Sequence, residues 1–211
     1  SPEGRTPRQT KRPQIALRDA ILPWITFEEP EFNRVLQWFK DQVITETKGV
    51  FSDLTAQVHG FTFVFGLGGI HGSVESEIIE STETHSIVDL DVTSYYPNLA
   101  ITNGFYPAHL GPEFCTIYKN LFDQRKQYPK KSAESAMLKL ALNGVYGDSN
   151  NQFSPFYDPL FTMSITLNGQ LLLCKLAEDL MAIPGLRMIQ VNTDGLTVLI
   201  PNESRWLLDA R

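Results

Sequence analysis

Two strand-like runs meet at a turn in the stretch RMIQVNTDGLTVLI, residues 187–200. Residues 187–191 and 196–200 are mainly aliphatic and β-branched, and the four residues between them, Asn192-Thr193-Asp194-Gly195, are turn formers. The stretch therefore predicts a β-hairpin with Asp194 near its tip.

A second strand upstream carries two further acids. Residues 86–92 are predicted to form a buried strand with Asp89 and Asp91, and Pro97 ends it. Carboxylates at rigid strand ends can hold Mg²⁺, which prefers oxygen ligands and leaves positions for water and phosphate. Two such ions about 3.5–4 Å apart can clamp the attacking and leaving oxygens of an in-line phosphoryl transfer. Taken singly, Asp91 and Asp194 are equally well explained as turn formers or caps.

The remaining pattern is mixed. Helical periodicity covers residues 30–45, 132–147 and 159–181, and residues 59–65 indicate a strand that the glycines of Gly66-Leu67-Gly68-Gly69 interrupt. Strands, then helices, then a hairpin favour the α+β class.

The predicted helix 132–147 carries a polar stripe. Lys139, Asn143 and Tyr146 project within about 60° of one another at 100° per residue. A cation, an amide and a phenol in that order suit a triphosphate and a base pair. The alternative is an ordinary solvent-facing side, which the helix alone favours.

Charge is distributed unevenly along the chain. The net charge of the 211 residues is −6, yet residues 119–139 hold six basic and two acidic side chains, a balance of +4 that leaves −10 elsewhere. A basic island in an acidic body suits a protein that grips phosphate at one place, although a solvated helix face gives the same run. The basic, proline-containing residues 1–28 are predicted to be a disordered leader or linker.

Composition indicates a soluble intracellular protein. No apolar run approaches the roughly 18 residues of a membrane span, and no signal peptide opens the chain. The two cysteines form no disulfide framework, and the four histidines lack zinc-ligand spacing. We therefore expect no membrane partner.

Three segments together resemble the polymerase motifs of family B DNA polymerases of phages. Residues 91–97, DVTSYYP, resemble motif A, D-x-x-S-L-Y-P; residues 139–147, KLALNGVYG, resemble motif B, K-x-x-x-N-S-x-Y-G; and residues 192–195, NTDG, resemble motif C, D-T-D-S. Asn192, Gly195, Gly144 and Tyr95 depart from the family pattern. Order and spacing agree with the family, and the resemblance covers about residues 66–200.

The resemblance implies a polymerase palm, an antiparallel sheet backed by helices, with a short helical-hairpin fingers insertion. Palm segments would span residues 29–118 and 148–211, with the fingers at residues 119–147. An exonuclease and a thumb are expected to be absent from this chain.

The resemblance also implies roles. Asp91 and Asp194 would be catalytic metal ligands, with the Val92 carbonyl completing one site for two Mg²⁺ ions, for which Mn²⁺ can substitute. Nucleotide-binding positions would be Ser94, Tyr95, Tyr96, Arg125, Lys130, Lys139 and Asn143, with Tyr96 excluding a 2′-hydroxyl. Lys131 is the alternative to Lys130, because Pro129 stands where the family usually has a basic residue. Tyr146 and Gly147 would contact DNA.

The glycine-rich loop is a weaker match. Gly66-Leu67-Gly68-Gly69 resembles the Y-x-G-G loop of protein-primed phage polymerases, which implies DNA contacts at Gly68 and Gly69. A plain tight turn explains the same residues equally well.

The implied function is template-directed transfer of a deoxynucleotide from dNTP to the primer 3′-hydroxyl in phage DNA replication. Its partners would be primer–template DNA and dNTP, and its place the host cytoplasm. The isolated fragment is expected to be weak or inactive. The alternative is a catalytically inactive palm that serves as a DNA-binding or scaffolding module. Reverse transcriptase is disfavoured, because Gly195 rather than a second aspartate follows Asp194.

Overall fold

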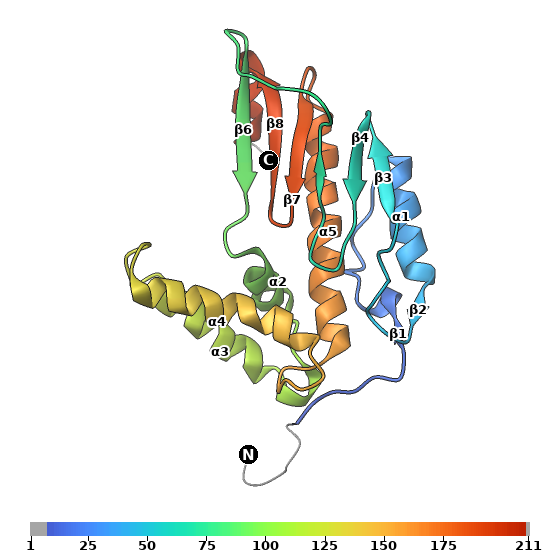
Figure 1. Ribbon diagram of the computed structural model, residues 1–211, viewed down its shortest axis with the longest axis vertical. Coiled ribbons are helices and arrows are strands. Elements are labelled where there is room, and N and C mark those ends of the chain that lie inside the picture. Colours follow the sequence, from blue (N-terminus) through green and yellow to red (C-terminus); the bar gives the residue numbers. More distant parts are fainter. Residues whose placement is uncertain (1–7, 210–211) are drawn as a thin grey trace. The chain divides into compact units, whose positions relative to one another are not determined.

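The computed structural model describes residues 8–209, which form two compact units (Figure 1). The first unit comprises residues 8–20, 43–47 and 94–168, and the second comprises residues 21–42, 48–93 and 169–209. Helices and small antiparallel sheets alternate along the chain, which agrees with the predicted α+β class.

A four-stranded antiparallel sheet organises the second unit. Its strand order is β5 (Gly72–Ser73), β7 (Arg187–Asn192), β8 (Gly195–Pro201) and β6 (His85–Asp91). The hairpin β3 (Thr55–Val58) and β4 (Phe61–Val64) lies beside it, and a bridge from Val64 to His71 connects β4 to the segment that enters β5 (Figure 1). The predicted hairpin at residues 187–200 is therefore confirmed as β7 and β8.

The strand that carries Asp91 differs from the prediction. Residues 86–92 are predicted to form a buried strand, but β6 is an edge strand that pairs only with β8 among the described residues. Ile87, Asp89 and Asp91 project from its exposed face, whereas Val88 and Leu90 are half-buried. The sequence pattern of such a strand still contains apolar residues, because one face of the strand packs against the protein while the other face is open to solvent.

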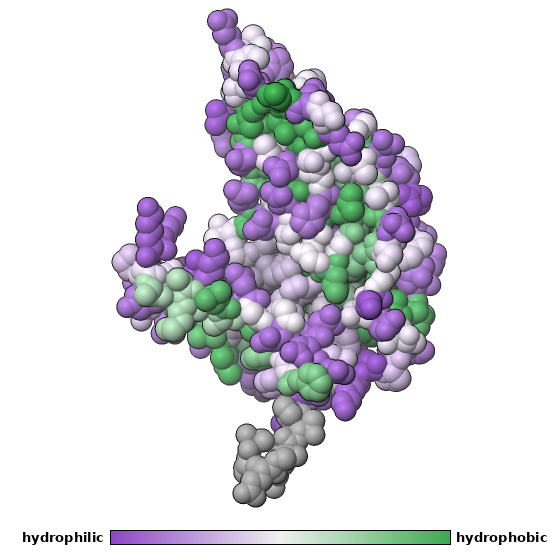
Figure 2. Space-filling model, viewed as in Figure 1, coloured by the Kyte–Doolittle hydropathy of each residue, from purple (hydrophilic) through white to green (hydrophobic). Residues whose placement is uncertain are grey.

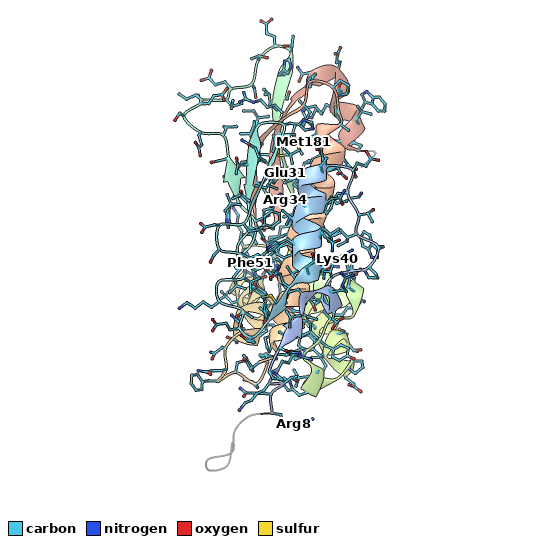
Figure 3. All side chains as sticks on the ribbon, turned by 90° about the vertical axis from the view of Figure 1, so that its right-hand side faces the viewer. Arg8, Glu31, Arg34, Lys40, Phe51 and Met181 are labelled. Carbon is cyan, nitrogen blue, oxygen red and sulfur yellow. The ribbon has the colours of Figure 1, made fainter. Side chains whose placement is uncertain are left out.

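Helix α1 (Pro30–Asp41) packs by aromatic contacts. Phe32 meets Phe63 edge-on with ring centroids 5.1 Å apart, and Phe39 meets Phe51 and Phe65 in the same manner. On the helix surface, Arg34 Nε binds Glu31 Oε2 at 2.6 Å, and Arg34 Nη2 donates to the Thr55 carbonyl of β3 at 2.6 Å (Figure 3). The helix stops at Asp41 rather than at residue 45, because Val43–Ile44 form strand β2 against β1, Ile15–Ala16.

Helix α5 (Pro159–Met181) has the predicted bounds, and its residues are divided between the units at Asn168 and Gly169. By length and hydropathy it would suffice to cross a membrane, contrary to the reading that no apolar run reaches that length, but 78% of its apolar window is buried within the structure. Its Glu178 carboxylate accepts hydrogen bonds from the backbone of Glu28 and Glu29 at 2.7 and 2.6 Å, just before α1 begins. That burial is typical of a core helix.

The first unit is mainly helical. It contains α2 (Tyr95–Asn103), α3 (Glu113–Arg125) and α4 (Ala133–Ser149), with short 3₁₀ turns at Leu17–Asp19 and Ala108–Leu110; a further 3₁₀ turn, Asn202–Leu208, follows β8 in the second unit. Ser132 caps α4 as predicted, its Oγ accepting from the Ser135 N–H at 3.1 Å. Hydrophilic side chains cover the tip where α3 and α4 are joined (Figure 2).

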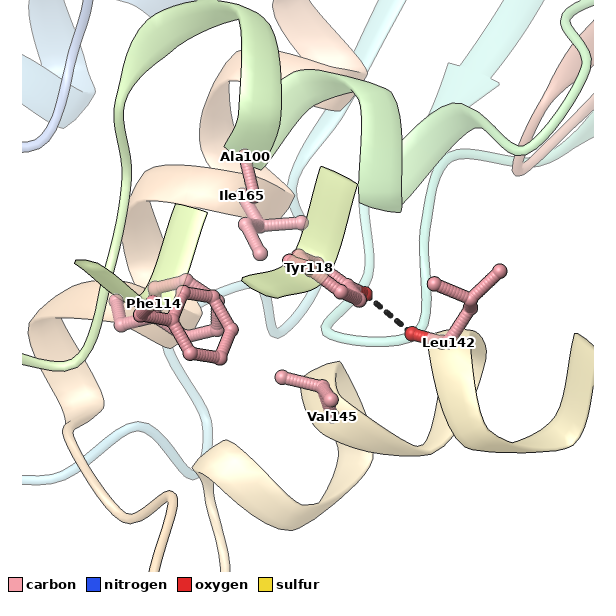
Figure 4. Packing of buried hydrophobic residues seen from close by; sticks show 7 residues of the cluster. Ala100, Phe114, Tyr118, Leu142, Val145 and Ile165 are labelled. Atoms are coloured by element: carbon pink, nitrogen blue, oxygen red, sulfur yellow. Dashed lines mark hydrogen bonds between the residues drawn. The ribbon is translucent and has the colours of Figure 1, made fainter. Parts of the chain in front are cut away.

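The α3–α4 pair is held by a buried cluster. Phe114 and Tyr118 of α3 pack with Leu142 and Val145 of α4, and the Tyr118 hydroxyl donates to the Leu142 carbonyl (Figure 4). These apolar positions leave the opposite face of α4 to solvent.

The predicted leader is ordered where the structure describes it, which corrects the expectation for residues 8–28; residues 1–7 lie outside the described residues. Apolar side chains from this segment are buried, namely Ile15, Leu17, Ala20, Ile21, Ile25 and Phe27. Arg12 forms an ion pair with the buried Asp158 at 2.8 Å. Burial of these apolar groups offsets the conformational entropy that the segment loses when it becomes ordered, despite its basic and proline residues.

Candidate active site

Asp91 and Asp194 come together at one end of the four-stranded sheet. Asp91 is the last residue of β6 and lies opposite Gly195, the first residue of β8. Asn192 pairs with Gly195, so Thr193 and Asp194 alone form the turn between β7 and β8. The Val92 N–H donates to the Asp194 carbonyl at 2.8 Å. Both carboxylate side chains belong to exposed residues.

Gly195 makes room for the first of these acids. A Cβ atom built on Gly195 would lie 2.5 Å from Asp91 Oδ1 and 2.9 Å from the Leu90 carbonyl oxygen. The glycine that departs from the motif C pattern thus matches the space that the Asp91 carboxylate takes up.

The donors at this end suit a hard cation. The two carboxylates and the Val92 carbonyl offer only oxygen atoms as ligands. The described residues contain no group of three or more His, Cys, Asp or Glu side chains that could hold a metal ion, so this end of the sheet supplies two side-chain ligands. Mg²⁺ is usually bound through one or two carboxylates together with water and substrate phosphates, so the residues fit this ion better than Zn²⁺.

Asp89 lies on the same exposed face but is otherwise engaged. It sits opposite Thr197, whose hydroxyl donates to Asp89 Oδ1 at 2.6 Å. Asp89 therefore belongs to the sheet surface two residues before the strand end, while Asp91 stands free of that partnership.

Two further residues at this end were not singled out by the sequence. Thr193 contacts Gly69 and hydrogen-bonds to Gly68, and Gln170 of α5 accepts from the Gly66 N–H at 3.0 Å. Gln170 is 1% exposed, and a polar residue within the apolar run of α5 was the available signal, since buried amides require partners. Gly68 is exposed and Gly69 is buried.

In the first unit, the start of α2 carries the predicted phosphate-binding backbone. Ser94 is the N-cap, with φ 48° and ψ 53°, and its carbonyl accepts from the Asn98 N–H at 3.0 Å. A left-handed conformation is uncommon for a serine. The N–H groups of the first helical turn can bind an anion, which is compatible with the role expected for Ser94 and Tyr95.

Tyr96 and Tyr146 are brought into contact. Their ring centroids are 4.7 Å apart with an interplanar angle of 63°. Burial raises the pKa of the Tyr146 phenol above its ordinary value, and a hydrogen bond with Thr166 partly opposes that rise. Motif A and motif B therefore share one aromatic pair inside the first unit.

The predicted cationic and polar residues lie on and around α4. Lys139, Asn143 and Gly147 are exposed, whereas Leu142 and Val145 on the other side of α4 are buried. Tyr146, the third residue of the predicted polar stripe, is half-buried against Tyr96, so only Lys139 and Asn143 of that stripe face solvent. Arg125 Nε donates to the Ser135 carbonyl at 3.2 Å, which joins the end of α3 to the start of α4. Lys130 and Lys131 are both exposed in the loop between these helices.

Known proteins offer limited parallels. No protein-family model and no curated protein matches this chain. Among solved structures, it is similar to the family B DNA polymerase from the hyperthermophilic archaeon Pyrobaculum calidifontis, with 19% identity and a TM-score of 0.40. The match covers 65% of this chain and 25% of the polymerase, so the chain spans about a quarter of that protein's length. Over part of its length, therefore, this chain is similar to a family B DNA polymerase.

Proposed function

We propose that this chain is the palm, with a short α3–α4 fingers hairpin, of a family B DNA polymerase of phage type. It would transfer deoxynucleotides from dNTP to the 3′-hydroxyl of a DNA primer on a template strand. The observation that carries the proposal is the register of β6 against β8, which sets Asp91 beside the turn of Asp194 at one exposed sheet end. The type of reaction is inferred from the resemblance of residues 91–97, 139–147 and 192–195 to the polymerase motifs.

In the second unit, Asp91 and Asp194 would hold two Mg²⁺ ions, with the Val92 carbonyl as a further ligand. Bound there, such ions stabilise the charge on the attacking and leaving oxygens of a phosphoryl transfer. The protein's part is to keep both carboxylates fixed, and the hydrogen bond from the Val92 N–H to the Asp194 carbonyl serves that purpose.

In the first unit, cationic and polar groups would bind the nucleotide. Lys139 and Arg125, with Lys130 or Lys131, would neutralise the triphosphate, and the N–H groups at the start of α2 would donate hydrogen bonds to its oxygens. Asn143 and Tyr146 would contact the base pair, while Gly147 and Gly68 would lie near the DNA backbone. Tyr96, held against Tyr146, would exclude the 2′-hydroxyl of a ribonucleotide.

The test is Mg²⁺-dependent primer extension, measured on this chain at high concentration and on the longer polymerase of which we propose it is a part. Asp91→Asn and Asp194→Asn are each expected to abolish extension while the fold persists. Asp89→Asn is the matched control, because it lies on the same strand face and its amide oxygen can still accept from Thr197. Extension by either site variant at the rate of the Asp89→Asn control would remove that aspartate from the site.

A further inference from the structure

The glycine-rich loop at residues 66–69 lies directly against the turn that carries Asp194. A Cβ atom built on Gly69 would lie 2.6 Å from both Cγ2 and Oγ1 of Thr193, and 2.8 Å from its Cβ. Gly69 is buried and has a φ of +129°, so both the contact and the backbone require a glycine. Thr193 Oγ1 in turn donates to the Gly68 carbonyl at 3.3 Å.

The loop itself is anchored at both ends. At its start, the Gly66 N–H donates to the buried Gln170 of α5 at 3.0 Å, and the Gly69 N–H closes a turn onto the Gly66 carbonyl at 3.1 Å. At its end, His71 exchanges two backbone hydrogen bonds with Val64, of 2.7 and 2.9 Å. Strand β5 then pairs with β7, Gly72 opposite Val191. The loop is therefore a fixed surface against which Thr193 rests.

The turn at Thr193 and Asp194 is thus held from two sides. On one side the Val92 N–H binds the Asp194 carbonyl at 2.8 Å, and on the other Gly68 and Gly69 hold Thr193. A two-residue turn without such contacts can vary its backbone angles, and a small change at Thr193 redirects the next side chain, that of Asp194.

We propose that Gly69 and Thr193 are positioning residues that fix the Asp194 carboxylate for metal binding, with the glycine-rich loop as their support. The inference rests on the proposed function, because it assigns a purpose to the loop only if Asp194 binds a cation. It gives Gly69 a role inside the protein, distinct from close approach to a DNA backbone.

The experiment is a Mn²⁺ titration of the 211-residue chain, followed by paramagnetic broadening of backbone amide signals around residues 91 and 194. Gly69→Ala is expected to raise the Mn²⁺ dissociation constant by about 10-fold to 100-fold, the range for loss of groups that orient metal ligands. Gly60→Ala is the matched control. Gly60 also has a positive φ, +79°, but a Cβ there meets nothing within 4 Å, so it carries the backbone strain without the contact.

A second pair of variants keeps the test valid if Gly69→Ala does not fold. Thr193→Val retains the side-chain shape but loses the hydrogen bond to Gly68, whereas Thr193→Ser retains the hydroxyl. Thr193→Val is expected to weaken Mn²⁺ binding in the same direction as Gly69→Ala, and Thr193→Ser to bind nearly as the unsubstituted chain does. A purely structural role would lower thermal stability in these variants and leave the Mn²⁺ affinity of the folded protein unchanged.

Asp194→Asn separates the two hypotheses. If Asp194→Asn loses Mn²⁺ binding while Gly69→Ala and Thr193→Val bind normally, the positioning role is overturned and the metal site stands. If Mn²⁺ fails to broaden signals around residues 91 and 194 in the unsubstituted chain, or if Asp194→Asn binds as well as that chain, the proposed metal site is wrong and the positioning role falls with it.

Discussion

The backbone N–H of Val92 donates a hydrogen bond to the carbonyl oxygen of Asp194 at 2.8 Å. This bond extends the β6–β8 ladder by one step beyond Asp91 and Gly195, into the turn between β7 and β8. It ties two segments that are distant in sequence at the point where each carries an acid. The bond therefore fixes the backbone beside two exposed carboxylates whose like charges repel each other.

Gly195→Ala is expected to destabilise the protein by about 1–3 kcal/mol, the usual cost of inserting a methyl group into filled space. The added Cβ would lie 2.5 Å from Asp91 Oδ1, which can move, but also 2.9 Å from the Leu90 carbonyl, which belongs to the paired strand. Urea unfolding of both proteins measures the change. An unaltered free energy of unfolding would mean that the strand end opens at no cost.

Asn192→Asp is expected to leave primer extension active and to lower the Mg²⁺ concentration of the optimum. Asn192 is exposed beside the turn, where its Oδ1 accepts a 3.4 Å hydrogen bond from Gln190 Nε2. An acid there adds negative charge near the ions and strengthens their binding by about 10-fold or less. A Mg²⁺ titration of extension compares the two proteins. Extension that is absent in the original and restored by the acid would support an inactive palm.

Tyr96→Ala is expected to increase ribonucleotide incorporation relative to deoxyribonucleotide, on the order of tenfold to a hundredfold, because the ring that would exclude the 2′-hydroxyl is removed. Tyr96→Phe keeps the ring and its 4.7 Å contact with Tyr146, so it serves as the control. Single-nucleotide incorporation with matched dNTP and rNTP gives both ratios. Equal discrimination by the alanine variant and the original would make Tyr96 a packing residue only.

Tyr118→Phe is expected to lower the free energy of unfolding by about 1 kcal/mol, because the hydroxyl that binds the Leu142 carbonyl is lost. Burial also raises the pKa of the Tyr118 phenol above its ordinary value. The stability that depends on the neutral phenol is therefore complete below about pH 10 and is lost as the pH rises toward the folded-state pKa.

The measurement is urea unfolding at about pH 8 and about pH 11, on either side of the ordinary tyrosine pKa. The original protein should lose more stability between these values than Tyr118→Phe does. Equal losses would show that Tyr118 ionises as readily in the folded protein as in the unfolded chain.

Several elements could be predicted from sequence because the signals were local. The turn residues at 192–195 set the hairpin, and the apolar run of α5 set its bounds. Ser132 began α4 at the predicted place, because its hydroxyl can satisfy the free N–H of Ser135 without help from distant residues. The motif spacing likewise nominated Asp91 and Asp194 before their strands were placed.

The sequence-based predictions were wrong for segments whose structure depends on contacts with residues far away in the chain. Residues 8–28 look like a linker by composition, yet Leu17 and Ile25 are buried and Arg12 pairs with Asp158. Helix α1 ends at Asp41 because the next residues pair with β1, a partner that periodicity cannot reveal.

The sequence by itself therefore determined the hairpin and the bounds of α5, and it nominated Asp91 and Asp194, since each of these depends on the pattern within short segments. Only the tertiary structure decided that the Thr193 side chain occupies the space into which a Cβ on Gly69 would project. It also decided that Gln170 accepts a hydrogen bond from the loop and that the Val92 N–H binds the Asp194 carbonyl. These contacts join residues far apart in the chain, and their existence follows from strand register and packing, which no local pattern encodes.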